Sequence, residues 1–193
     1  CFVCEKDMPE GDLLRSEGPL TCSQCPNYVQ IEQMSGQGLL KHMGTHILYD
    51  AALRGADSPC GLCLNTGGLC EIYLLQRHGG EMVSIDQVKS RCPNLRPFQI
   101  KKAEEFTLKQ PCTNHPMLCP LCPHGAPAVW KYNLQSHIRV WHPLNNAALY
   151  EPHWRPHPDE HRLMEAEWDK LKRRRNRPSK ASSSRKLKIS DGH

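Results

Sequence analysis

The chain contains three Cys-x-x-Cys pairs, and two of these are followed by a closely spaced pair of histidines. The complete sets are Cys22, Cys25, His42 and His46, and Cys119, Cys122, His137 and His142. Two thiolates and two imidazoles form a common tetrahedral ligand set for Zn²⁺. Each histidine spacing brings both rings to one face of a helix, as a single ion requires. We therefore predict two zinc sites, with Leu39 and Leu134 packing one turn before the first histidine of each.

The third pair, Cys60 and Cys63, has no matching histidine pair. The residues available to complete its site are Cys70, His78, Cys92 and Cys112. We favour Cys92 and Cys112, which close a loop of about fifty residues and leave Cys70 as a spare thiol. A degenerate third finger through His78 is the alternative, since Leu75 precedes it at the same offset. Together the three sites predict three structural zinc ions.

Composition favours metal ions over a single large core. Aromatic residues make up only 6% of the chain, and the mean hydropathy is −0.61. Small modules with poor cores need disulfides or metals to hold them. The eleven cysteines are an odd number, and their two-residue gaps suit metal binding better than disulfides. We therefore prefer zinc to disulfide bridges.

Two further cysteines, Cys1 and Cys4, allow a rival arrangement at the start of the chain. Together with Cys22 and Cys25 they could form a Cys4 site. That arrangement leaves His42 without a role, so we prefer the site with two histidines. Cys1 and Cys4 are then half of a finger that begins upstream. No signal peptide or membrane-spanning run is visible, so we expect no membrane partner.

Charge is distributed unevenly along the chain. The net charge of +5 divides into +8 from residue 169 onward and −3 for the rest. We predict a helix over 158–175, because Pro158 and Asp159 suit its start and the basic run suits its end. The remainder, 177–193, is expected to be disordered. Two basic clusters resemble a bipartite nuclear localisation signal read by a nuclear import receptor: Lys170, Lys172, Arg173, Arg174, Arg175, Arg177, Arg185, Lys186 and Lys188.

Nucleic acid is the partner that this basic end favours, because such charges bind phosphate without reading sequence. Donors near the second histidine pair could add base contacts. The candidate contact residues are Lys131, Asn133, Gln135, Arg139, Arg173, Arg174 and Arg175. About seventy residues separate the two fingers, so they cannot follow one groove as a regular array. A protein-interaction scaffold is therefore the alternative function.

Catalysis has no positive signature in the chain. A catalytic zinc site needs an open coordination position and a nearby acid or base. The chain has neither a His-Glu-x-x-His motif nor a His-x-Glu half of a deaminase site. We therefore predict that it is not an enzyme. A RING-like ubiquitin ligase is a weaker alternative: Cys112, His115, Cys119 and Cys122 fit the middle of that spacing, which fails at both ends.

The motifs resemble those of the C2H2-type zinc-finger class. A narrower resemblance, over about residues 59–143, is to zinc-finger proteins of mushroom-forming fungi. It rests on the runs Cys60-Gly-Leu-Cys63, Pro111-Cys112-Thr-Asn, Cys119-Pro-Leu-Cys122 and Trp130-Lys-Tyr-Asn-Leu134. The resemblance implies zinc binding at Cys119, Cys122, His137 and His142, with a cysteine-rich site just upstream. It implies no particular activity.

These patterns predict small α+β zinc-stabilised modules: two C2H2-like fingers and a Cys-rich middle segment, with a C-terminal helix and a disordered basic tail. The function we expect is that of a nuclear, nucleic-acid-associated regulatory protein. The expected boundaries are a partial Cys-containing segment (1–21), the first finger and connector (22–58), the Cys-rich segment (59–116), the second finger (117–143), a linker and amphipathic helix (144–176) and the tail (177–193).

Overall fold

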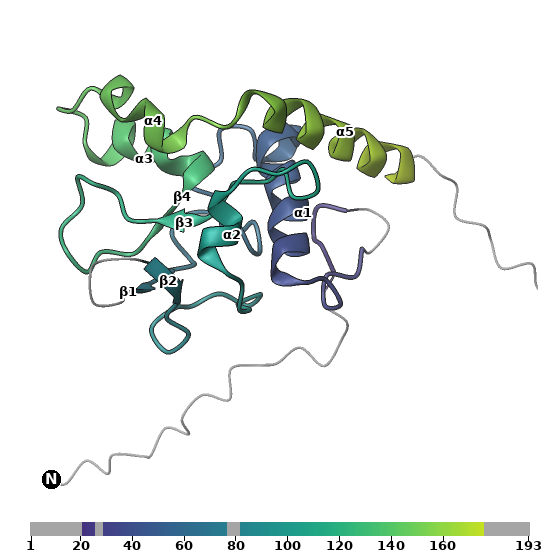
Figure 1. Ribbon diagram of the computed structural model, residues 1–193, viewed down its shortest axis with the longest axis horizontal. Helices are drawn as coiled ribbons and strands as arrows, with labels where there is room; N and C mark the ends of the chain where they lie inside the picture. The colour runs from purple at the N-terminus through teal and green to yellow at the C-terminus, as the bar shows by residue number, and fades with distance from the viewer. Residues whose placement is uncertain (1–20, 26–28, 77–81, 176–193) are drawn as a thin grey trace, which may run out of the picture.

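The computed structural model describes residues 21–25, 29–76 and 82–175 of the chain. Within these ranges, helices and two small antiparallel sheets are joined by long irregular segments (Figure 1). In chain order, with η for a 3₁₀ helix, the elements are α1 (Gly36–Tyr49), η1 (Ala51–Leu53), β1 (Leu74–Gln76), β2 (Met82–Ile85), α2 (Ile100–Glu104), β3 (Pro116–Met117), β4 (Val129–Trp130), η2 (Lys131–Asn133), α3 (Leu134–Trp141), η3 (Ala147–Tyr150), α4 (Glu151–Trp154) and α5 (Pro158–Arg175).

Helix α1 is the buried centre of the fold. It begins after Ser35, whose hydroxyl accepts a hydrogen bond of 3.1 Å from the backbone N–H of Gly38. Its buried face follows the helical repeat and combines apolar residues with candidate metal ligands: Leu39, Leu40, His42, Met43 and His46. The helix ends at Tyr49, and Asp50 then caps η1 through its carboxylate. A helix buried on so wide a face has little surface left for a partner.

The two sheets are short and lie on the same side of the molecule, away from α5 (Figure 1). In one sheet, β1 pairs with β2 and places Leu74 opposite Ile85. In the other, β3 pairs with β4 and places Pro116 opposite Trp130. The second Cys-x-x-Cys turn with a histidine pair lies between β3 and β4, and α3 follows after η2. This strand–strand–helix order brings the turn and the helix together.

Helix α5 spans the range predicted from the sequence and packs across α1 (Figure 1). Its first turn carries one half of a capping box: the Glu160 carboxylate accepts a 3.3 Å hydrogen bond from the backbone N–H of His157, and Pro158 occupies the first helical position. Residues four apart form the buried face, namely Glu160, Met164 and Trp168. Helix α5 is therefore packed into the fold, and this packing fixes the position of the helix that carries the basic residues.

A buried polar cluster ties α5 to two other segments. The fully buried Glu160 carboxylate accepts hydrogen bonds from the Thr113 backbone N–H at 2.7 Å and from the Tyr132 hydroxyl. The Lys131 ammonium donates to the Thr113 hydroxyl at 2.8 Å. Burial raises the pKa of Tyr132, so its hydroxyl keeps the proton that it donates. The cluster connects the segment before β3, η2 and the start of α5.

The larger hydrophobic core extends across three of the segments expected from the sequence. It contains Leu39 and Met43 from α1, Leu62 and Ile72 from the middle segment, and Trp130 from β4. Gly61 permits the close approach of the Trp130 ring, because a Cβ at this position would clash with the ring. A smaller core surrounds Leu134 and Ile138 of α3. The segments therefore share one hydrophobic core and are not independent modules joined by linkers.

Candidate metal centres

Three groups of four cysteine and histidine side chains could each hold a metal ion. Within each group the candidate ligand atoms all lie within 4.8 Å of one another. Ligands about 2.0–2.3 Å from a tetrahedral zinc ion would be separated from each other by about 3.3–3.8 Å. The groups are Cys22, Cys25, His42 and His46 (first group), Cys60, Cys63, Cys70 and Cys92 (middle group), and Cys119, Cys122, His137 and His142 (third group). All three are therefore suited to zinc binding.

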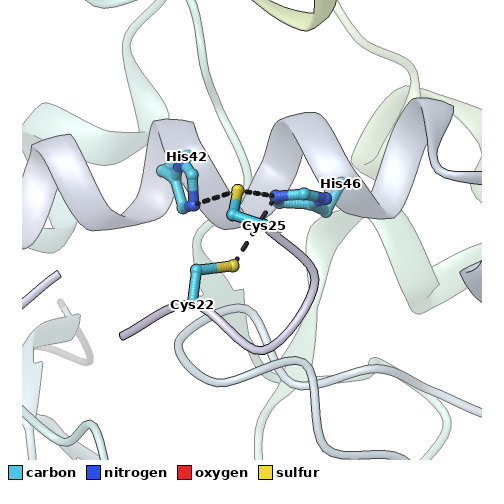
Figure 2. A group of neighbouring side chains, drawn as sticks. All are labelled: Cys22, Cys25, His42 and His46. Atoms are coloured by element: carbon cyan, nitrogen blue, oxygen red, sulfur yellow. Dashed lines mark hydrogen bonds between the residues drawn. The ribbon is translucent and has the colours of Figure 1, made fainter. Parts of the chain in front are cut away.

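In the first group, a turn supplies the thiols and α1 supplies the imidazoles (Figure 2). The Cys25 sulfur lies 3.7 Å from Nε2 of His42 and 3.2 Å from Nε2 of His46. The Cys22 sulfur lies 3.6 Å from Nε2 of His46. Because the histidines are four residues apart on the helix, both rings face the turn. All four side chains are buried.

Two neighbours hold His46 in place. Its Nδ1 lies 3.0 Å from a carboxylate oxygen of Asp50, which leaves Nε2 for a metal ion. The ring of Trp168 contacts it edge to face, with 5.6 Å between ring centroids. Burial alone would lower the pKa of His46, but Cys22 and Asp50 raise it above its ordinary value. Asp50 thus holds the imidazole from the end of α1, and Trp168 links this group to the C-terminal helix.

The middle group differs from the expected ligand set. Cys60 and Cys63 are joined by Cys92, as expected, but the fourth member is Cys70 and not Cys112. The Cys63 and Cys70 sulfurs are 3.4 Å apart, and those of Cys60 and Cys92 are 3.8 Å apart. Hydrogen bonding from the other thiols lowers the pKa of Cys60 and, with Cys60 ionised, raises the pKa of Cys92. Four thiolates can coexist here only beside a cation.

Cys112 lies elsewhere because tertiary packing places it between α1 and η2. Its sulfur is 3.4 Å from the Leu40 carbonyl oxygen and 3.7 Å from the Tyr132 hydroxyl. Burial raises its pKa to about 12, so it stays a neutral thiol. The signal for Cys70 is local: Gly67 and Gly68 both adopt positive φ and turn the chain back toward Cys63. His78 lies outside the described residues.

The third group is assembled at the edge of the molecule. The Cys122 sulfur lies 3.2 Å from Nε2 of His137 and 3.3 Å from Nε2 of His142, and Cys119 lies 3.7 Å from His142. His142 caps the C-terminus of α3 and is not within the helix. Only Cys119 is fully buried. Burial and the neighbouring His142 lower the pKa of His137, which favours the neutral ring that binds metals.

Two of the expected nucleic-acid contacts are engaged inside the protein. Asn133 is buried and its amide donates a 2.8 Å hydrogen bond to the Pro59 carbonyl. Lys131 belongs to the buried polar cluster, and desolvation lowers its pKa. Gln135 and Arg139 line a cavity of about 400 Å³ between α3 and the η3–α4 segment. The sequence pattern did not indicate that these side chains are engaged within the fold, because it cannot show which segments pack beside η2 and α3.

The basic end of α5 remains accessible where it is described. Lys172 and Arg173 are exposed, and Lys170 and Lys172 form only surface pairs with acidic residues one turn away. Arg174 and Arg175 complete the helix. The other expected localisation residues (Arg177, Arg185, Lys186 and Lys188), the tail 177–193, Cys1 and Cys4 all lie outside the described residues.

The ligands of a RING-like arrangement do not come together. Cys112 packs against α1, and Nδ1 of His115 lies 2.9 Å from the Thr113 carbonyl oxygen. Burial lowers the pKa of His115 to about 4. Neither residue belongs to any of the three groups found in the described ranges. Cys119 and Cys122 instead meet the two histidines that follow them.

Within the described ranges, no helix has the length and apolar character to cross a membrane. Comparisons of the chain with protein-family models, curated proteins and solved structures gave no match. Its function must therefore be inferred from its own geometry, in which three sets of cysteine and histidine side chains are the dominant chemical feature.

Proposed function

We propose that the three groups bind Zn²⁺ and that each ion is structural. The observation that carries this proposal is the close grouping of candidate ligand atoms: all lie within 4.8 Å of one another in each group, and those in contact are 3.2 to 3.8 Å apart, which fits the edges of a zinc tetrahedron. Each group offers four protein ligands, so a bound ion would keep no coordination position for water or substrate. A closed coordination shell of this kind stabilises a fold and does not supply catalysis.

Metal removal tests the zinc proposal directly. Native mass spectrometry of the purified chain should show three zinc ions, and a strong chelator should abolish both the ions and the helical circular dichroism signal. The reason is that structural zinc contributes free energy comparable with the whole stability of a small domain. A count of zero, or full retention of helical signal in the chelator, would overturn the proposal.

We further propose that the chain associates with nucleic acid in the nucleus through its basic C-terminal end. The charge separation supports this: residues from 169 onward carry a net charge of +8, against −3 for the rest. Helix α1 is buried and cannot enter a groove, and Lys131 and Asn133 are engaged within the fold. Contact with phosphates is therefore favoured over reading of bases.

Salt-dependent binding to duplex DNA or RNA tests this contact. The variant replaces the nine basic residues of the two predicted clusters, from Lys170 to Lys188, by serine. Its logarithmic salt slope should fall by roughly 0.9 for each lost phosphate contact. The control replaces three exposed basic residues elsewhere, Lys89, Arg91 and Lys102, and should bind as the parent does. Equal binding by all three proteins would contradict the proposal.

Two further measurements separate the parts of this proposal. As a fluorescent fusion, the nine-residue variant should lose nuclear accumulation while the control variant keeps it. Arg139→Ala should leave sequence preference unchanged, because this residue lines the cavity between α3 and the η3–α4 segment. If Arg139→Ala abolishes a sequence preference, α3 reads bases. The relationship to C2H2-type proteins stays a prediction.

A protein-interaction scaffold is the second candidate function. The observation that favours it is a groove between the middle and third groups, about 490 Å³ in volume, whose lining carries acidic and apolar side chains. Such a surface repels phosphate and suits a protein partner. Binding of nucleic acid at the basic end and of a protein at this groove are compatible, because different elements carry them.

A further inference from the structure

A groove lies between the middle and third metal groups and is here called the inter-site groove. It has a volume of about 490 Å³ and lies where the turn after Cys63 approaches α3. Cys60 and Cys70 form part of one wall, and Cys122 and His137 part of the other. Candidate ligands of two metal groups therefore border one and the same cavity.

Both walls are rigidly joined below the groove. The Trp130 ring packs against Gly61, where even a methyl group would clash. The Asn133 amide donates to the Pro59 carbonyl, and the backbone N–H of Ala128 donates to the Ile72 carbonyl at 2.6 Å. These contacts fix the middle segment to β4 and η2. The groove is thus preformed, which lowers the entropic cost of binding.

The carboxylate side chains that line the inter-site groove are not balanced by a cationic side chain in its lining. Asp57 and Glu71 are exposed and line it, and none of its lining residues is a lysine or an arginine. With the proposed zinc bound, the middle group adds to this, because four thiolates and one Zn²⁺ carry a net charge of −2. Phosphate-bearing partners are disfavoured here, and cationic groups are attracted.

Apolar surface accompanies these charges. Pro127 and Val129 line the groove, and Trp141 lines it while remaining 66% exposed. Leu69, beside the lining residue Gly68, is 75% exposed. A lysine or arginine side chain matches this combination, since its stem packs on apolar surface and its charge meets carboxylates or the face of a tryptophan.

We propose that the inter-site groove binds an extended, lysine- or arginine-bearing segment of a partner protein. The inference rests in part on the proposed zinc, through the charge of the middle group, and goes beyond association with nucleic acid. The chain's own basic segment is the competing occupant. The C-terminal end of α5 lies on the opposite side of the molecule from α3 (Figure 1), which favours a partner in trans.

Fluorescence anisotropy with a short labelled peptide tests the proposal. The peptide alternates lysine or arginine with alanine and leucine, and its counterpart carries glutamate in place of each basic residue. The zinc-loaded full chain should bind the basic peptide only. In the double variant Asp57→Asn/Glu71→Gln, and separately in Trp141→Ala, binding should weaken about five- to tenfold. The matched control Glu105→Gln/Glu165→Gln alters two exposed carboxylates elsewhere and should bind as the parent does.

Three results would overturn the proposal: equal binding of both peptides, no effect of the groove variants, or an effect of the control as large as theirs. A fourth reassigns the groove. If the basic peptide binds only after Lys180, Arg185, Lys186 and Lys188 are changed to serine, the occupant is the chain's own basic segment. Native mass spectrometry of every variant counts the bound zinc ions and so separates the two proposals. If three ions are bound but the peptide is not, the groove proposal is wrong and the zinc proposal stands. If the peptide binds to protein that carries no zinc, the zinc proposal is wrong and the groove proposal stands.

Discussion

The first and third metal groups have the same ligand types but lie in different surroundings. All four ligands of the first group are buried, and Asp50 and Trp168 contact its His46. In the third group, by contrast, only Cys119 is buried, and among the described residues no carboxylate is paired with His137 or His142. The same set of candidate ligands therefore lies in the core in one place and near the surface in the other. Loss of the first group should therefore unfold the whole described fold, whereas loss of the third should unfold only its surroundings.

The largest expected difference is between Cys25→Ser and Cys122→Ser. Serine keeps the size of the side chain but removes a thiolate ligand. Because the first group lies within the larger core, Cys25→Ser should unfold α1 and α5 together. Cys122→Ser should cost one zinc ion and loosen only the Cys119–Cys122 turn and α3, since these pack around the smaller core and Trp130 belongs to the larger one. Hydrogen exchange and zinc counting measure both effects. Global unfolding of Cys122→Ser would show that the two groups form one cooperative unit.

Features that depend on residues close in sequence could be predicted, and features that depend on tertiary packing could not. The membership of the first and third groups depended on spacings within about twenty-five residues, and the sequence indicated both. The range of α5 followed from local start and end signals. The inclusion of Cys70 had a local signal in Gly67 and Gly68, whereas the exclusion of Cys112 depended on how α1, η2 and α5 pack, which no local pattern contains. The burial of Lys131 and Asn133 had the same cause.

Replacing the tryptophan beside each of the two metal groups should give the next largest difference in stability. Trp168 is 9% exposed and covers the first group, whereas Trp141 is 66% exposed beside the third. Trp168→Ala should lower the free energy of unfolding by about 3 kcal/mol through lost packing, and Trp141→Ala by less than about 0.5 kcal/mol. Urea denaturation of the zinc-loaded proteins measures both. Similar losses would mean that α5 contributes no more to the core than the exposed end of α3.

The smallest expected effect concerns the carboxylate behind His46. Asparagine at position 50 can still cap η1 by accepting from Ala52, but it removes the charge that orients the imidazole. Asp50→Asn should therefore weaken zinc binding at the first group about tenfold at pH 8, measured by competition with a chelating dye. The third group, whose histidines have no such partner in the described residues, should keep its affinity in the same protein and serves as the internal control.

The pH dependence of this variant sharpens the argument. Cys22 and Asp50 raise the pKa of His46, so protons compete with the metal more strongly in the parent than at an ordinary histidine. Loss of the carboxylate lowers that pKa and weakens the competition. The difference in zinc affinity between parent and Asp50→Asn should therefore narrow as the pH falls from 8 toward 6. A difference that widens over this interval would mean that Asp50 acts on the metal site by some route other than the protonation and orientation of His46.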